Sequence, residues 1–246
     1  MPALGIARNQ RHRESMEDRI VTGLTNGALV VGVFDGHGGS IVSEHAASNA
    51  LEVVGTAMLR GFRGDTLWQS VFAQLDIESQ RCGSTATLLL VGDAELSAGW
   101  VGDSRALIVS ADGWRPLTAD HRLENSDERR RVVAAGASIV PPYAVDPKTE
   151  YGLMVTRALG DRDLRRIGII AEPETRTIAI GARDVGFVAA TDGLWDVVTN
   201  AEAAAVCRAE SPETAAMRLV EMVIARDGRD NVSVVVGRFA DEGVSE

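Results

Sequence analysis

The sequence predicts an α+β fold in which antiparallel sheet is covered by helices. Three strand-like segments, 85–91, 95–101 and 106–110, follow one another as a meander, and consecutive strands of a meander are antiparallel. Helical segments come in pairs between runs of strands, so the alternation of strand and helix that produces a parallel sheet is absent. The 246 residues show no linker, and we expect a single domain over 1–246.

The first half of the chain predicts a buried strand and two helices ahead of the meander. Residues 28–34 form a nearly unbroken apolar run that stops at the glycine-rich sequence 35–39, as expected of a buried strand that leads into a turn. Ser40 is the candidate N-cap of the first helix, and Asp65 is the candidate N-cap of the second.

The second half begins with a helix and a flap. Asn125 or Ser126 is expected to cap a helix that ends at Gly136. Prolines interrupt the pattern soon afterwards, so the segment between Ala137 and Val155 is expected to be an irregular loop or flap.

Strands and two helices complete the pattern. The Thr199 and Glu202 pair forms a capping-box sequence, and Ser211 followed by Pro212 marks a second helix start. The remaining strands are expected at 152–156, 175–180, 186–190 and 232–239.

Composition restricts the class of protein. Hydrophobic residues make up 45% of the chain and charged residues 24%, as in ordinary soluble proteins. Cys82 and Cys207 could form one bridge at most, which excludes a disulfide-rich secreted scaffold and favours a reducing compartment. No apolar run is long enough for a membrane span, and residues 1–10 lack the apolar stretch of a signal peptide. We therefore expect a cytoplasmic protein without a membrane partner.

The charged residues argue against two further classes. The net charge of −10 disfavours nucleic acid as a partner, because phosphate backbones attract clustered positive charge. Lys148 is the only lysine and stands between Pro147 and Thr149, so the Gly-Lys-Ser/Thr sequence of a nucleotide-binding loop cannot form. Walker-type nucleotide hydrolysis is excluded.

Aspartates stand at the boundaries of the predicted buried strands. Asp35 and Asp192 terminate two apolar runs, whereas the Asp-Gly pairs at Asp112 and Asp227 are expected to be simple turns. A half-buried carboxylate is costly unless it is hydrogen-bonded, paired or bound to a metal.

Two further acids, Asp18 and Asp230, stand at comparable boundaries. If Asp18, Asp35, Asp192 and Asp230 converge, two divalent cations would balance their charge of about −4. Oxygen ligands without a zinc motif favour Mg²⁺ or Mn²⁺. Spacing along the chain does not by itself bring the four together.

Eight motifs occur between Arg13 and Asn231: RESMED at 13–18, VFDGHGG at 33–39, GSTA at 83–86, GDSRA at 102–106, LTADH at 117–121, TRALGD at 156–161, ATDGLWD at 190–196 and GRDN at 228–231. In this order they resemble the motifs of the metal-dependent protein phosphatase family, type 2C. The resemblance implies a four-layer αββα sandwich, in which two antiparallel β-sheets are flanked by helix pairs. Because little chain precedes Arg13, the edge strand common in that family is expected to be short.

The resemblance also implies a two-metal centre with Mg²⁺ or Mn²⁺. Asp35 resembles the carboxylate that bridges both ions, Asp18 resembles a ligand of one, and Asp192 and Asp230 resemble ligands of the other. Gly36 would contribute its backbone carbonyl, since a glycine lets the main chain approach an ion closely.

Two more acids resemble those that hold a weaker third metal ion in many members of the family, namely Asp103 and Asp196. The alternative interpretation is structural: Asp103 would be an acid in a turn, and Asp196 would be an acid at the N-terminus of a helix.

Three residues are assigned to the reaction itself. Arg13 would clamp the phosphate through its planar guanidinium, although without the motif it would be interpreted as a surface arginine. His37 would be the general acid that protonates the leaving oxygen, and Glu17 would orient metal-bound water. A water bridging the two metals would attack without a covalent intermediate. Neither cysteine is followed six positions on by arginine, which excludes a cysteine-phosphatase loop.

The remaining basic residues have structural interpretations. His45 is expected within a helix and His121 in a structural role. The arginine run 129–131 is expected to be a solvated helix face, and no chemical role is assigned to Arg157.

The sequence therefore predicts a Mg²⁺- or Mn²⁺-dependent phosphatase that acts on phosphoserine and phosphothreonine in the substrates of a Ser/Thr kinase. We expect a monomer. Two alternatives stay open: a catalytically silent relative that acts as an interaction module, and a phosphatase for small phosphoesters.

Overall fold

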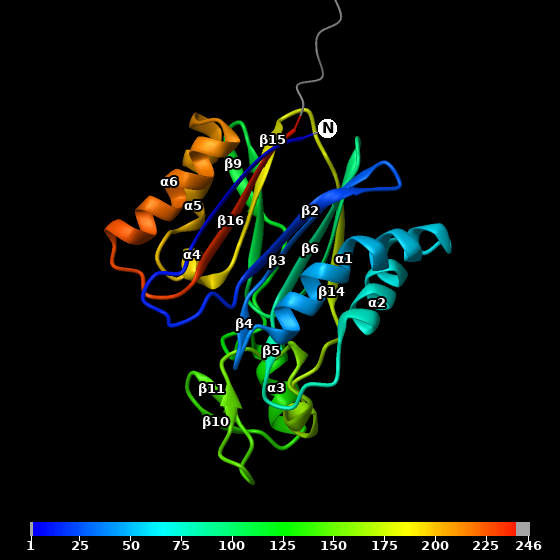
Figure 1. The fold of residues 1–246 in the computed structure, drawn as a ribbon, viewed down its shortest axis with the longest axis vertical. Helices are drawn as coiled ribbons and strands as arrows, with labels where there is room; N and C mark the ends of the chain where they lie inside the picture. Colours follow the sequence, from blue (N-terminus) through cyan, green and yellow to red (C-terminus); the bar gives the residue numbers. More distant parts are fainter. Residues whose placement is uncertain (1, 240–246) are drawn as a thin grey trace, which may run out of the picture.

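Two five-stranded antiparallel sheets stack face to face, and helices cover the outer face of each (Figure 1). The structure, a computed structural model, describes residues 2–239. The strand order is β1-β16-β15-β8-β9 in the first sheet and β14-β7-β6-β3-β2 in the second. The predicted αββα sandwich is confirmed.

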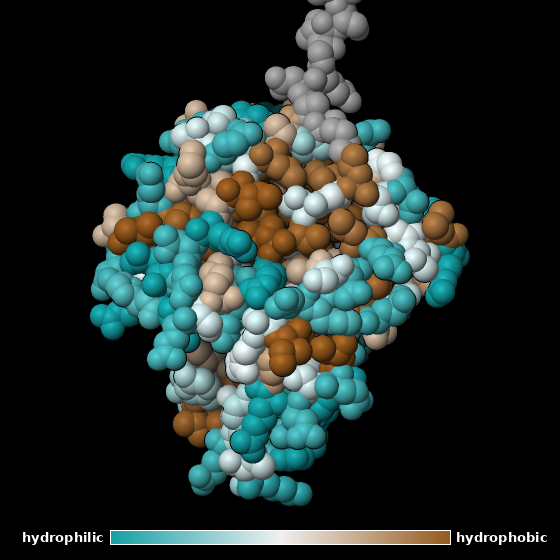
Figure 2. Space-filling view, viewed as in Figure 1, coloured by the Kyte–Doolittle hydropathy of each residue, from teal (hydrophilic) through white to brown (hydrophobic). Residues whose placement is uncertain are grey.

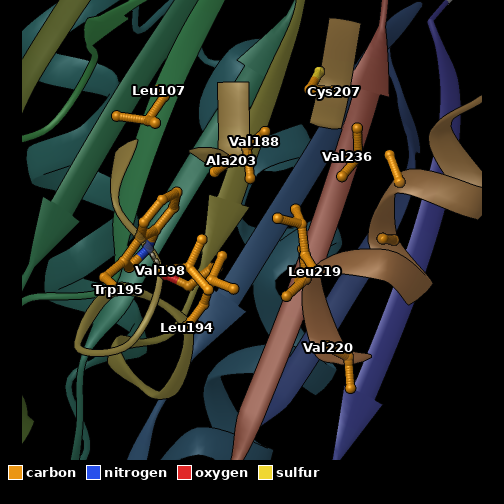
Figure 3. Packing of buried hydrophobic residues seen from close by; sticks show 14 of the residues in the cluster. Leu107, Val188, Leu194, Trp195, Val198, Ala203, Cys207, Leu219, Val220 and Val236 are labelled. Carbon is orange, nitrogen blue, oxygen red and sulfur yellow. Dashed lines mark hydrogen bonds between the residues drawn. The ribbon is translucent and has the colours of Figure 1, made fainter. Parts of the chain in front are cut away.

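The first sheet is covered by the C-terminal helices. Its strands are β1 (Ala3–Asn9), β16 (Val232–Arg238), β15 (Asp184–Ala190), β8 (Arg105–Ser110) and β9 (Gly113–Pro116), and its helices are α4 (Asp192–Trp195), α5 (Asn200–Ala209) and α6 (Pro212–Ala225). Val188 and Val236 on the strands share one buried cluster with Ala203 and Leu219 on the helices (Figure 3).

The second sheet is covered by the first two helices. Its strands are β14 (Glu174–Ala179), β7 (Glu95–Val101), β6 (Ala86–Val91), β3 (Ala28–Phe34) and β2 (Arg19–Thr25), and its helices are α1 (Ile41–Leu59) and α2 (Gly64–Leu75). Along β3, Val30 and Phe34 pack toward the helices, whereas Val31 and Val33 pack toward the first sheet. Both faces of β3 are therefore buried, which explains its continuous apolar sequence.

Several predicted boundaries need correction. The strand before Arg13 is not short: β1 has seven residues and pairs with β16 along its whole length. Asp65 is not an N-cap, because α2 begins at Gly64. Ser40 stands at the N-cap of α1 but makes no capping hydrogen bond. Strand β2 was not predicted, because its residues are mostly half-buried and do not alternate clearly between buried and exposed positions.

The flap is more ordered than expected. A small antiparallel sheet lies between Ala137 and Val155, where irregular chain was expected. Its strands are β10 (Ser138–Val140), β11 (Tyr143–Val145) and β12 (Gly152–Leu153). The predicted strand 152–156 is therefore only two residues long. This sheet lies with α3 (Ser126–Ala134) at one end of the sandwich (Figure 1). Together with the 3₁₀ helix η1 (Arg162–Ile167), they surround a separate small core. Asn125 caps α3 by accepting from the Asp127 N–H.

Three two-residue strands connect the flap region to the sandwich. They are β4 (Gly36–His37), β5 (Gly83–Ser84) and β13 (Leu159–Gly160). The glycine-rich sequence that follows β3 thus lies where the flap meets the two sheets (Figure 1).

Hydrophobic residues reach the surface along the seam between the two halves of the sandwich, while hydrophilic residues cover most of the rest of this face (Figure 2). Within residues 2–239, none of the helices has the length and apolar character needed to cross a membrane.

Candidate metal centre

Strand ends from both sheets bring the predicted acids to one end of the sandwich. Asp35 directly follows β3 of the second sheet, and Asp192 begins α4 just after β15 of the first sheet. Asp230 lies two residues before β16. All three line one cleft of about 640 Å³, which Arg13 and His37 also line.

Asp18 is the predicted ligand that does not line this cleft, although it is near enough to Asp35 for its charge to act there. Its side chain is fully buried, and Oδ2 accepts a hydrogen bond from the Thr191 hydroxyl at 2.9 Å. Burial raises the pKa of Asp18 to about 6, although the hydroxyls of Ser233 and Thr191 act in the opposite direction. Its Oδ1 is buried and has no hydrogen-bond partner.

The carboxylates disfavour one another's charge. Burial and the neighbouring Asp192 and Asp18 raise the pKa of Asp35 well above its usual range. Burial and the charge of Asp103 raise the pKa of Asp192 to about 8. Like charges gathered in a poorly solvated site produce such shifts unless a cation compensates them.

These residues fit hard divalent cations by their chemistry. The donors are carboxylate oxygens, and the unpartnered Oδ1 of Asp18 is available as a ligand. Only glycine fits at position 36, because a Cβ there would lie 2.6 Å from the Glu17 carbonyl oxygen and 2.7 Å from the Ser43 hydroxyl. As the side chains lie, no three His, Cys, Asp or Glu residues among 2–239 enclose a position for an ion. Two arginines, Arg13 and Arg122, contact the carboxylates instead.

Arg13 lies at the rim of the cleft. Its Nη2 is 2.5 Å from Oδ2 of Asp230, and 59% of its side chain is exposed. The guanidinium is therefore accessible to a ligand in the cleft while it is held beside a predicted metal ligand.

Glu17 connects the cleft to the glycine-rich loop. Its Oε2 accepts from the Gly39 N–H at 3.1 Å, and its own N–H donates to Oδ1 of Asn231 at 2.8 Å. The Asn231 side chain also donates to the carbonyls of Gln10 and Ser15. Asn231, which was not among the predicted site residues, thus joins the segment around Arg13 to the start of β16.

His37 has a buried partner, Asp161, that the sequence did not predict. Its Nε2 lies 2.6 Å from Oδ2 of Asp161, whose side chain has no exposed surface. The GD pair at 160–161 belongs to one of the eight motifs, but nothing in the sequence connects it to a histidine 124 residues away.

Arg122 was also missed, and it contacts the two acids assigned to a third metal. Asp103 is almost fully buried and lines the cleft, whereas Asp196 does not line it and is 54% exposed. Arg122 contacts both of them as well as Asp192. The pair does not fit a third metal ion as it stands, because a guanidinium already bridges the two carboxylates.

The apolar side of the cleft comes from the flap. Tyr143, Leu153, Met154 and Val155 line the cleft together with the charged residues. A bound substrate would therefore contact both the metal centre and the flap.

The other basic residues lie away from this chemistry. His45 is within α1, and the buried His121 accepts from the Gly102 N–H and stacks on Trp100. The arginine run 129–131 was expected to be a solvated helix face. This prediction is wrong for Arg131, which donates to Glu128 and to the carbonyl of Thr156.

Arg157 contacts a residue of helix α3. Its Nη2 lies 2.7 Å from Oε1 of Glu128, whose side chain is 3% exposed. This ion pair connects α3 to the segment that leads into β13.

The chain is similar to known phosphatases along nearly its whole length. The family model for protein phosphatase 2C matches residues 3–232. Probable protein phosphatase 2C 45 of Oryza sativa subsp. japonica is 36% identical over 96% of this chain and 86% of that protein. Probable protein phosphatase 2C 59 of Arabidopsis thaliana is 36% identical over 96% of this chain and 79% of that protein.

A solved structure has the same fold. The serine-threonine phosphatase 2C from Toxoplasma gondii superposes with a TM-score of 0.81 at 23% identity, covering 97% of this chain and 95% of that one. The chain belongs to the protein phosphatase 2C family of serine/threonine protein phosphatases, which in general depend on Mg²⁺ or Mn²⁺.

Proposed function

We propose that this protein hydrolyses phosphoserine and phosphothreonine in proteins by direct attack of water on phosphorus, without a covalent enzyme intermediate. The observation that supports it most is the convergence of Asp35, Asp192 and Asp230 on one cleft, with Asp18 near enough to Asp35 for its charge to act there. Two Mg²⁺ or Mn²⁺ ions, when bound by these acids and the Gly36 carbonyl, would neutralise the phosphate and supply hydroxide near neutral pH.

The chain's own residues would do the rest of the work. Arg13 would exchange part of its contact with Asp230 for two phosphate oxygens. As the bond from phosphorus to the serine or threonine oxygen breaks, His37 would give that oxygen a proton. Asp161 would hold the imidazole ring in place, and Glu17 would orient the attacking water from the edge of the cleft.

Substrates, assembly and location are inferred more indirectly. The partners would be phosphoproteins made by a Ser/Thr kinase, dephosphorylated here in signalling. The monomeric state and the cytoplasmic location stay predictions from the sequence.

The test is metal-dependent turnover of one phosphothreonine peptide. We expect hydrolysis with Mn²⁺ and none with excess chelator. Asp35→Asn should abolish turnover, whereas Asp112→Asn, which alters an exposed Asp-Gly turn paired with Arg183, should not. Turnover that persists in chelator would contradict the proposal, and turnover confined to small esters would indicate a different phosphatase.

A further inference from the structure

Arg122 occupies the pocket between the acids assigned to a third metal ion. Its Nε lies 2.5 Å from Oδ2 of Asp103, its Nη2 lies 2.9 Å from Oδ2 of Asp192, and its Nη1 lies 3.3 Å from Oδ1 of Asp196. Each of the three guanidinium nitrogens thus contacts a different carboxylate. The planar fork of arginine suits such a bridge, which the single nitrogen of a lysine could not make.

The backbone around Arg122 is anchored on both sides. The N–H of the preceding residue, His121, donates to the Gly102 carbonyl at 3.0 Å, next to Asp103 itself. Arg122 forms an antiparallel β-bridge with Val155, at the end of the flap. The Arg122 side chain is 21% exposed. Arg122 therefore belongs to the framework of the centre: its backbone is anchored and most of its side chain is buried.

The neighbouring acid Asp120 does not compete for Arg122, because another arginine already pairs with it. Asp120, two residues earlier, is bound by Arg105 through two hydrogen bonds of 3.0 and 2.6 Å. Asp103 has no second arginine among its hydrogen-bond partners in the described residues. Removal of Arg122 would leave Asp103 buried without a counter-charge, and such a carboxylate recruits a proton or a cation.

We propose that Arg122 replaces the third metal ion in this chain, so that the protein binds two divalent cations and holds Asp103, Asp192 and Asp196 with its own guanidinium. The inference rests on the two-metal centre of the proposed function. A divalent ion and the guanidinium would compete for the same oxygens and repel each other, so both cannot occupy the pocket.

The test is the number of Mn²⁺ ions bound, measured by titration calorimetry and by metal analysis after equilibrium dialysis. Wild type should bind two ions, and Arg122→Met should bind one more, with lower affinity. Adding Asp103→Asn to Arg122→Met should remove the extra ion. Arg115→Met, which breaks an ion pair with the buried Asp184, is the matched control and should keep two.

Two results would overturn the inference. A wild type with three ions, reduced to two by Asp103→Asn, would show that a metal occupies the pocket, and the proposed function would survive. A wild type that binds none would overturn the proposed function and this inference together. If circular dichroism shows that Arg122→Met does not fold, wild type and Asp103→Asn are compared instead: two ions in both support the inference, and three ions that fall to two overturn it.

Discussion

Nε2 of His37 lies 2.6 Å from Oδ2 of Asp161, a carboxylate without exposed surface. Asp161 has a left-handed backbone (φ 47°), and a Cβ at Gly83 would overlap its carboxylate. The strained backbone and the required glycine indicate that the surroundings hold this carboxylate in place. With Nε2 engaged, Nδ1 would be the ring nitrogen that transfers a proton in the proposed reaction.

We expect Asp161→Asn to lower kcat for a phosphothreonine peptide by roughly 10–100-fold with little change in KM, because the general acid would lose its orientation. The loss should be much smaller for p-nitrophenyl phosphate, whose leaving group needs no proton. Asp163→Asn, two residues further along the chain, alters a looser 3.5 Å pair with Arg81 and should behave as wild type. Equal losses on both substrates would show that Asp161 is merely structural.

Replacing Asp192 should separate activity from stability. We expect Asp192→Asn to lower turnover by roughly 100-fold or more and to weaken Mn²⁺ binding. Its metal-free form should melt at or above the wild-type temperature near pH 8, because burial and Asp103 disfavour the charge of Asp192. Calorimetry, phosphopeptide kinetics and thermal melts measure the three quantities. Near wild-type turnover would contradict the assignment of Asp192.

Stability of the metal-free protein should fall as pH rises from about 5 to 8. The folded-state pKa values of Asp18 (about 6) and Asp192 (about 8) are raised above that of an unfolded aspartate. The native state therefore binds more protons than the unfolded state in this window, which costs up to about 1.4 kcal/mol per pH unit for each proton. On acidification this stability is regained progressively, and it is fully present below about pH 4, where both groups are protonated in both states.

Mn²⁺ should reverse this trend, because it binds the ionised carboxylates. Thermal melts at pH 5.5 and pH 8, in chelator and in Mn²⁺, measure both effects. We expect Mn²⁺ to raise the Tm more at pH 8 than at pH 5.5. A metal-free Tm that is flat or rises over this range would argue against the mutual repulsion of these acids.

Glu128 should hold helix α3 to the segment that contains Thr156 and Arg157. Burial would raise its pKa, but hydrogen bonds from Arg157, Arg131 and Thr156 lower it to about 2. Glu128→Ala would leave Arg131 without its carboxylate partner and Arg157 with only its 3.4 Å contact to Glu174, and it should destabilise the protein by about 3–5 kcal/mol. Denaturant unfolding measures the loss, and Asp127→Ala, which breaks an exposed pair with Arg130, should have no measurable effect. Since the lowered pKa stabilises only the ionised form, the contribution of Glu128 should be lost as pH falls from about 4.5 to 2.

Local patterns were sufficient where one segment carries its own signal. The apolar run of β3 and the segment 95–101 of β7 are strands with the expected bounds. The capping box of Thr199 and Glu202 begins α5 as expected. The flap strands β10 and β11 were not predicted, because prolines dominate their local pattern and their pairing depends on neighbouring strands.

From the sequence alone came the αββα architecture, the phosphatase family and the aspartates that gather in the cleft, since apolar periodicity and short motifs are properties of neighbouring residues. Only the tertiary structure paired Asp161 with His37 and Arg122 with Asp192, partners that lie 124 and 70 residues apart. The local sequence around a charged residue does not identify its partner, because the attraction between two charges depends on their distance and burial in the folded chain.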